Sequence, residues 1–287
     1  MGTFHQFRKS REGRLYQLLE DLQREEDFEL NVIPAHLRAI ENEYNVKVLL
    51  AVATGSRAWG WDSPSSDWDV RFIYVHKPEW YFKIEPQRDV IEKMTDDNVD
   101  LAGWELRKAL YLLKRNNPSL LEWLNSSTVF CLDEEFGRRI HEIEANFFNP
   151  VKSMYHYNGM YNKYNERYFG EDGFPIKGFI YYLRGVLSCK WIETRMSLPP
   201  TRFSDLLDAT VEDQKIRSMI DDVIKIKKGL LKSDKQVVDD SLVAYARHLA
   251  DYYNDTIDSF RPELNEASAD ALDSILYDMV MANALDK

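Results

Sequence analysis

The sequence has few of the residues that covalent cross-links, thiolate metal sites and membrane anchors require. Its 287 residues include only two cysteines, Cys131 and Cys189. Two cysteines so far apart exclude a disulfide framework and a cysteine-ligated zinc site, and we expect both to be small buried residues. No apolar run is long enough to cross a membrane, and the N-terminus lacks the apolar centre of a signal peptide. We therefore expect a cytoplasmic protein with no membrane partner.

Positive charge is also in short supply. The chain has 37 lysines and arginines against 48 aspartates and glutamates, a formal net charge of -11. That balance argues against nucleic-acid binding over a broad basic surface, although a local basic groove is compatible with the acidic net charge. The hydrophobic share of 44% is ordinary for a globular protein and is enough to bury a substantial core. The length suits one large domain or two modest ones.

The most informative part of the sequence begins at a glycine and serine that follow an apolar run. Residues 46–53 have the length and composition of a buried strand, and residues 68–75 resemble a second strand. Gly55 allows a sharp turn between them, and Ser56 can cap a short helix after it. Free backbone N–H groups at such a turn favour an anion, for which a phosphate is the obvious candidate.

Two carboxylates follow this turn at close spacing. Because side chains alternate along a strand, Asp67 and Asp69 would leave the same face about 6 to 7 Å apart. Like charges held that close repel each other unless a cation lies between them, and Mg²⁺ prefers such oxygen ligands. Either feature alone is commonly a solvated loop or a plain turn. In this order, between two strands, they indicate phosphoryl or nucleotidyl transfer.

These residues carry a family resemblance. The segments Gly-Ser-Arg-Ala-Trp-Gly and Ser-Pro-Ser-Ser-Asp-Trp-Asp-Val resemble the signature of the DNA polymerase beta-like nucleotidyltransferase superfamily, and within it the RNA-repair-associated RlaP-type group. The resemblance implies that Asp67 and Asp69 bind Mg²⁺ (or Mn²⁺). It also implies that Gly55 and Ser56 hold the β- and γ-phosphates of a nucleoside triphosphate such as ATP, and that Ser66 belongs to the nucleotide site.

The superfamily keeps a third carboxylate on a strand beside the first pair, and Asp100 is our choice for that catalytic and metal-binding role. It follows an alternating segment, residues 89–94, and an acidic turn at residues 96–98. Asp97 and Glu105 lie nearby in the sequence and remain alternatives. An aspartate at the end of a strand is also a common turn residue.

The rest of the chain is expected to be mainly helical. We predict an α/β protein in which a small mixed-sheet nucleotidyltransferase domain, residues 1–130, is followed by a helical domain, residues 131–287, that covers the nucleotide site. The predicted helices are at residues 9–26, 34–44, 105–114, 119–125, 149–168, 174–192, 211–231, 236–260 and 267–285.

One of these helices carries cations that could reach a nucleotide. Lys177, Tyr181 and Arg184 lie on one side of the helix predicted at residues 174–192, four and three residues apart. Cations on an otherwise apolar helix need partners. The resemblance implies that Lys177 and Arg184 contact the triphosphate or base, and the competing interpretation is helix packing with surface salt bridges. The tyrosines of residues 149–168 could stack on bases, but such spacing more often marks a core.

The functional expectation is a metal-dependent nucleotidyltransferase. It would move a nucleoside monophosphate from a nucleoside triphosphate to an acceptor hydroxyl, and the resemblance implies an RNA end, such as that of a tRNA under repair. Two alternatives remain open from the sequence. The acceptor could be a protein or a small molecule, or the protein could sense a nucleotide without catalysis.

Overall fold

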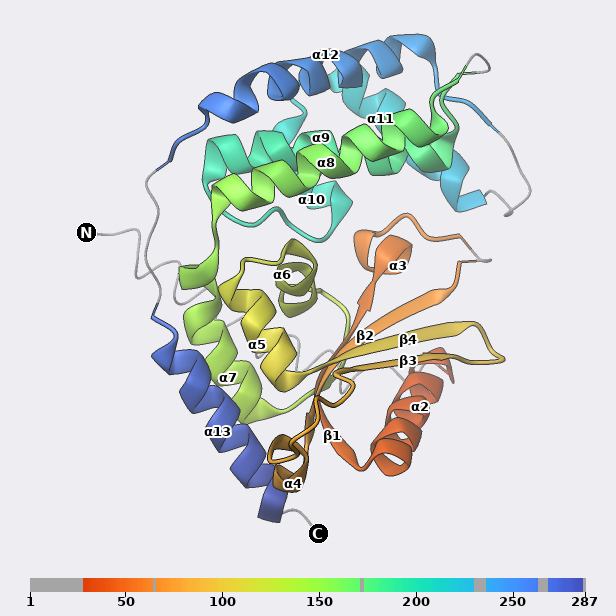
Figure 1. Cartoon of the computed structure of the whole chain (residues 1–287). Helices are drawn as coiled ribbons and strands as arrows, with labels where there is room; N and C mark the ends of the chain where they lie inside the picture. The colour runs from red at the N-terminus through yellow and green to blue at the C-terminus, as the bar shows by residue number, and fades with distance from the viewer. Residues whose placement is uncertain (1–27, 64–65, 171–172, 230–235, 263–267, 286–287) are drawn as a thin grey trace.

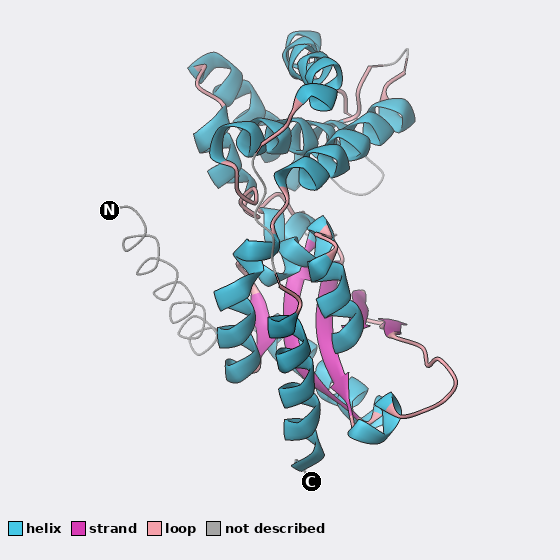
Figure 2. Cartoon of the chain, turned by 60° about the vertical axis from the view of Figure 1, so that its left-hand side comes forward, coloured by secondary structure: helices cyan, strands magenta, loops and turns pink. Residues whose placement is uncertain are grey.

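The computed structural model describes residues 28–63, 66–170, 173–229, 236–262 and 268–285. The chain forms a mixed α/β structure in which a five-stranded sheet lies below a group of helices in the view of Figure 1. Figure 2 shows the same two layers from the side. In the described part of the chain, no helix combines the length and apolar character that crossing a membrane requires. The helix predicted at residues 9–26 lies outside the described residues.

The sheet has the strand order β3-β4-β2-β1-β5. Its strands are β1 (Val46–Thr54), β2 (Trp68–His76), β3 (Val90–Met94), β4 (Val99–Glu105) and β5 (Val129–Leu132). Strands β2 and β4 are parallel, and the other neighbouring pairs are antiparallel. The mixed sheet and its first four strands were predicted from the sequence, but β5 was not.

Strand β1 is buried because both faces of the sheet are covered. Its alternate residues Ala51 and Ala53 belong to one apolar cluster, whereas Leu50 and Val52 belong to another. The first cluster includes helix α2 (Phe28–Tyr44). The second includes α5 (Leu106–Lys114), α6 (Pro118–Leu124), α7 (Glu134–Ile143) and α13 (Asp270–Leu285).

Helix α2 begins earlier than the sequence indicated. We expected a helix that starts at Pro34, because proline is favoured in a first turn. The structure instead places Pro34 inside the helix. A proline there costs a backbone hydrogen bond. Packing offsets that cost, since Ile33 is only 1% exposed and Ile40 is fully buried against the sheet.

A second apolar core lies among helices above the sheet in Figure 1. It is built mainly from α8 (Pro150–Tyr168), α9 (Ile176–Arg195), α10 (Phe203–Thr210), α11 (Gln214–Gly229) and α12 (Asp240–Thr256). The short elements α4 (Pro78–Tyr81), η1 (Glu144–Phe147) and η2 (Ile257–Ser259) connect the longer ones.

We predicted a domain boundary at residue 130, and segments on both sides of it contribute to the sheet layer. That position falls inside β5. Helices α7 and α13 come after it in the sequence but pack in the cluster of the sheet, side by side in Figure 1. Asn283 of α13 donates to the backbone oxygen of Val75 at 3.3 Å, so the end of the chain returns to the sheet.

Candidate active site

The turn after β1 contacts a carboxylate of β2. Strands β1 and β2 are antiparallel, which places Thr54 opposite Asp69. Gly55 follows with φ +67°, in the region that favours glycine. A Cβ added to Gly55 would lie 3.2 Å from Cγ of Asp69 and still closer to its Oδ2. The Gly-Ser turn at the start of helix α3 (Gly55–Trp59) and the Asp69 carboxylate therefore form one site.

The third carboxylate comes from the neighbouring parallel strand. The register of β2 and β4 pairs Asp69 directly with Asp100. Both side chains are about one-third exposed, at 36% and 35%. The structure thus brings together two of the three acids that the sequence assigned to the site. Asp97, one of the two alternatives, bonds to His36. Glu105, the other, is 1% exposed and caps helix α5.

Arg71 joins the two carboxylates. It follows Asp69 by two residues and so lies on the same face of β2. Its Nη2 is 3.0 Å from Oδ2 of Asp100 and 3.4 Å from Oδ1 of Asp69, and its Nη1 donates to the backbone oxygen of Asp100 at 2.9 Å. Arg71 was not among the predicted site residues, although the alternation along β2 places it on the same face as Asp69.

The charges around Asp69 affect its carboxyl group. Burial is the largest cause that raises the pKa of Asp69, and the negative charges of Asp100 and Asp67 raise it further. The positive charges of Arg71 and Lys177 oppose this rise. A site in which several carboxylates raise the pKa of one of them favours an added cation.

Asp67 lies immediately before β2, in a loop that α3 holds in place. Nε of Arg57 donates to the backbone oxygen of Asp67 at 3.3 Å, and Nη2 donates to that of Ser66 at 2.8 Å. The same guanidinium lies 4.2 Å from the ring centroid of Trp68. Arg57, from the Gly-Ser-Arg segment, therefore ties the short helix to the loop that carries Asp67.

Ser66 was predicted to contact the nucleotide, and its side chain takes part in this loop. Its Oγ accepts a hydrogen bond from the backbone N–H of Ser63 at 3.0 Å and lies 3.2 Å from the Ser63 hydroxyl. In this arrangement Ser66 shapes the approach to Asp67.

The donor set of the site fits magnesium bound together with substrate phosphates. Within residues 28–63, 66–170, 173–229, 236–262 and 268–285, no three His, Cys, Asp or Glu side chains come together as ligands for one ion. Mg²⁺ commonly binds through one or two carboxylates plus phosphate oxygens rather than in an all-protein cage. The pair Asp69 and Asp100, with Asp67 nearby, meets that requirement.

Two lysines of the helical layer carry positive charge close to the site. Lys177, in the first turn of α9, is exposed, and its charge acts on Asp69. Burial, followed by the charge of Lys177, lowers the pKa of Lys227 near the end of α11. Lys177 therefore neighbours both Asp69 and Lys227, and two neighbouring cations favour a polyanion at this position. Lys177 was predicted from the sequence and Lys227 was not.

An aromatic wall stands beside these lysines. Tyr181, one turn after Lys177, stacks on Tyr164 at a centroid distance of 5.0 Å and meets Trp59 of α3 edge-on at 5.3 Å. Burial, together with the charges of Tyr164 and then Asp69, raises the pKa of the Tyr181 hydroxyl. Tyr157 and Tyr161 of α8 are fully buried, so the core interpretation holds for that part of the helix.

The position of Arg184 differs from that of a nucleotide-contacting residue, the role that the resemblance implied. It is 1% exposed, its Nη2 donates to Oε1 of Glu122 at 2.8 Å, and its guanidinium lies 4.7 Å from the ring centroid of Trp59. A nucleotide could reach it only if these groups moved apart. The competing interpretation, helix packing with an ion pair, therefore describes the position of Arg184. The sequence showed which side of α9 Arg184 occupies, but it did not show that Glu122 of α6 faces it.

Known proteins resemble this chain. The model of the family described as RlaP, RNA repair pathway DNA polymerase beta family, matches residues 31–278. The chain is 42% identical over 192 residues to the uncharacterized protein YcgL of Bacillus subtilis (strain 168), a match that covers 67% of this chain and 74% of that protein. A nucleotidyltransferase-like protein from Exiguobacterium sibiricum 255-15 aligns with 85% of this chain and 78% of its own, at a TM-score of 0.30 and 11% identity.

Proposed function

This chain belongs to the RNA repair pathway DNA polymerase beta family, and from that premise we propose that it is a metal-dependent nucleotidyltransferase. It would transfer a nucleoside monophosphate from a nucleoside triphosphate to an acceptor hydroxyl. One observation carries the proposal: the Gly55 turn contacts the carboxylate of Asp69, which is itself paired across the sheet with Asp100.

The triphosphate would lie between the turn and the helical layer. Backbone N–H groups in the first turn of a helix have no partners within that helix, so those at Gly55 and Ser56 can donate to the β- and γ-phosphates. Lys177 and Lys227 would neutralise the remaining phosphate charge from above. The aromatic wall of Tyr181 and Tyr164 offers a surface on which a base can stack.

Asp67, Asp69 and Asp100 would hold magnesium, or manganese, when the nucleotide binds. The metal would neutralise the charge on the phosphates and polarise a phosphoryl oxygen. Asp69 and Asp100 already attract one positive charge in this structure, because Arg71 forms ion pairs with both of them. Arg57 positions the Asp67 loop through the two backbone oxygens that it contacts.

The reaction requires alignment of two oxygens on the α-phosphorus. The acceptor hydroxyl oxygen forms a new bond to that phosphorus, the bond to the bridging oxygen of the β-phosphate breaks, and pyrophosphate leaves. The hydroxyl proton is lost to solvent. The chain contributes the fixed positions of the turn, the carboxylates and the lysines, which is where catalysis of phosphoryl transfer mainly comes from.

The family description supports an RNA end as the acceptor, and a tRNA under repair would be one such substrate. The test is to incubate the protein with each α-labelled nucleoside triphosphate and Mg²⁺ or Mn²⁺. The acceptors are tRNA, other RNA, protein and small molecules. The variants Asp67→Asn and Asp69→Asn are assayed in parallel.

Label on RNA that depends on both aspartates is the expected result. Label that both variants transfer as well as the wild type would overturn the assignment of the site. Label only on protein or a small molecule would keep the chemistry and replace the acceptor. Nucleotide binding without transfer to any acceptor would indicate a sensor.

A further inference from the structure

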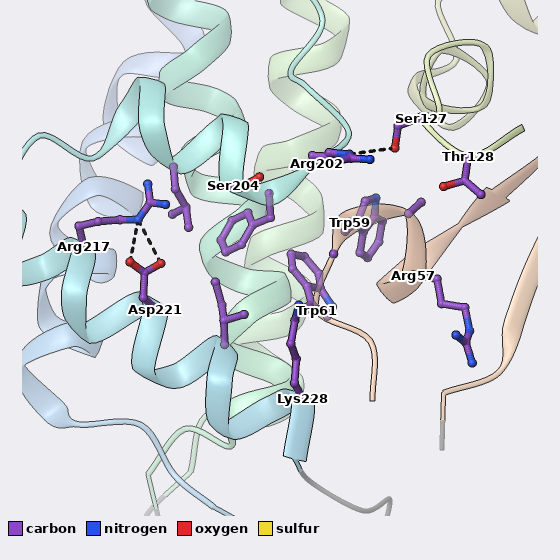
Figure 3. A pocket seen from close by; sticks show the side chains of 15 residues that line it. Arg57, Trp59, Trp61, Ser127, Thr128, Arg202, Ser204, Arg217, Asp221 and Lys228 are labelled. Carbon is purple, nitrogen blue, oxygen red and sulfur yellow. Dashed lines mark hydrogen bonds and ion pairs between the residues drawn. The ribbon is translucent and has the colours of Figure 1, made fainter. Parts of the chain in front are cut away.

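A cavity opens on another side of helix α3, away from the carboxylates. Its volume is about 470 Å³. Its walls come from α3, from the residues just before β5, from the start of α10 and from α11 (Figure 3). None of Asp67, Asp69 or Asp100 lines it. It is therefore a second candidate site that the proposed catalytic centre does not use.

The cavity is basic in a strongly acidic protein. Arg57, Arg202, Arg217 and Lys228 line it, whereas Asp221 is the one acid among its lining residues. Two of these cations are already engaged. Arg217 pairs with Asp221 at 3.1 Å, and the guanidinium of Arg57 is directed away from the cavity toward the Asp67 loop (Figure 3).

The other two cations are Arg202 and Lys228. Nε of Arg202 donates to the hydroxyl of Ser127 at 3.4 Å, and Lys228 lies at the end of α11 on the other side of the cavity (Figure 3). Among the residues that the structure describes, neither forms an ion pair with a carboxylate. In a chain with a net charge of -11, two cations that form no ion pair with a described residue thus line one cavity. That arrangement favours an anionic ligand.

Neutral hydrogen-bonding groups and an aromatic ring complete the lining. The hydroxyls of Ser127, Thr128 and Ser204 are on the walls. Trp59, which is half-buried, lines the cavity and also forms the edge of the aromatic wall beside Tyr181. Cations and hydroxyls are the groups that contact phosphate and sugar in nucleic-acid complexes, and aromatic rings accept bases.

Helix α3 connects the cavity to the carboxylates. Its first residue, Gly55, contacts Asp69, and its last, Trp59, lines the cavity. Five helical residues span about 7 Å. A strand whose end reaches the carboxylates could therefore continue into the cavity within a short length of chain.

We propose that this cavity binds a backbone phosphate of the single-stranded RNA acceptor, with Arg202 and Lys228 as its cationic contacts. The proposal rests on the proposed function, because it assumes that the acceptor is RNA. A single strand fits better than a duplex, since a cavity of this volume admits a phosphate with its sugar but not a double helix. A protein acceptor is the competing case, and the two cations with three hydroxyls favour phosphate over a neutral peptide.

The test is RNA binding without turnover. A fluorescent short single-stranded oligoribonucleotide is titrated with the full-length protein, and anisotropy is followed at several salt concentrations. The variant is Arg202→Ala/Lys228→Ala. The matched control is Lys215→Ala/Lys225→Ala, which removes two exposed lysines of α11 that do not line the cavity. A duplex of the same sequence and a labelled unstructured polypeptide are the other probes.

We expect the cavity variant to bind the single strand about tenfold more weakly than the control does. The slope of log K against log salt should fall by about 0.7, since each phosphate that the protein neutralises on a single strand contributes about 0.7. Equal RNA affinities and equal slopes for the two variants would overturn the proposal. Tighter binding of the wild type to the polypeptide than to the RNA would also overturn it.

A separate measurement distinguishes failure here from failure of the catalytic proposal. Binding of an α-labelled nucleoside triphosphate does not involve the cavity, so the cavity variant should retain wild-type nucleotide affinity. If the cavity variant binds RNA as tightly as the control does while Asp69→Asn still abolishes label transfer, only the cavity inference fails. If Asp69→Asn leaves transfer intact, the proposed function fails whatever the RNA affinities are.

Discussion

Gly55 lies so close to Asp69 that a single methyl group on its Cα would collide with the carboxylate. The contact links the end of β1 to the second residue of β2. Because the turn and the acid share this surface, a phosphate held at the turn and a cation held by the acid would touch. That adjacency is the physical basis for placing nucleotidyl transfer at this end of the sheet.

The first prediction uses this contact. Gly55→Ala should lose stability, about 1 to 2 kcal/mol from the left-handed backbone alone, and should also displace the Asp69 carboxylate. Gly60→Ala is the matched control, because Gly60 has φ +86° but no heavy atom within 4 Å of an added Cβ. Thermal unfolding should show a loss for both variants, and only Gly55→Ala should lose Mg²⁺-dependent nucleotide binding. Equal nucleotide affinities for the two variants would contradict the predicted contact.

The second prediction concerns Arg71. Replacing it by methionine removes the positive charge between Asp69 and Asp100, so the two carboxylates repel each other. Without divalent cations, Arg71→Met should unfold at a lower temperature than the wild type. Added Mg²⁺ should raise the Tm of the variant more than that of the wild type. Arg138→Met, which removes an exposed arginine paired with Glu135 and Glu142, serves as the control. An identical Mg²⁺ response in Arg71→Met and the wild type would count against the carboxylate pair as the cation site.

The third prediction separates packing from nucleotide binding at Arg184. Arg184→Met leaves the Glu122 carboxylate without its cation and should cost about 3 to 5 kcal/mol of unfolding free energy. Arg184→Met/Glu122→Met should recover part of that loss, although the Tyr157 hydroxyl then loses its acceptor on Glu122. Denaturant unfolding measures both. A fully folded Arg184→Met protein that has lost nucleotide affinity would show that Arg184 contacts the nucleotide after all.

The fourth prediction concerns pH. Burial, with a smaller effect of the Lys83 charge, lowers the pKa of His76 from 6.5 to about 4. The unfolded chain therefore binds more protons at this residue between those values, and stability is lost as the pH falls from 6.5 toward 4. His76→Phe keeps a ring to stack on Trp80, which His76 contacts at a centroid distance of 4.4 Å, but cannot take up a proton. Denaturant unfolding across this window should show a smaller loss for His76→Phe than for the wild type. The exposed His248→Gln should follow the wild type, and parallel curves for all three would contradict the assignment.

Much of the sheet could be predicted from local pattern. The apolar run before Gly55 and the alternation of residues 68–75 and 89–94 became β1, β2 and β3, because each signal lies within one short segment. We predicted that Asp100 lies on a strand beside the first two acids, and the register of β2 and β4 pairs it with Asp69. The local pattern also identified α8 and α9 as helices.

The features that were missed depend on contacts between distant segments. β5 has four residues and is held by β1, where the backbone N–H of Ala53 donates to the oxygen of Thr128 at 2.9 Å. Helix α13 joins the sheet layer through partners far away in sequence, such as Arg139 with Asp278. Arg217 and Lys228 of α11 share a cavity with residues of α3, although the two helices are far apart in sequence, and Lys227 of α11 is a neighbour of Lys177. Single-sequence periodicity contains none of this information.

The most direct test of the central claim is the rate of pyrophosphate release with a nucleoside triphosphate, Mg²⁺ and RNA. Wild-type protein is compared with Asp69→Asn and Asp100→Asn, and with Asp273→Asn as an exposed aspartate of α13 far from the carboxylates in sequence. We expect Asp273→Asn to keep the wild-type rate, and Asp69→Asn and Asp100→Asn each to lose at least about 100-fold, equivalent to about 2.7 kcal/mol of transition-state stabilisation. Release at the wild-type rate from Asp69→Asn would contradict the central claim.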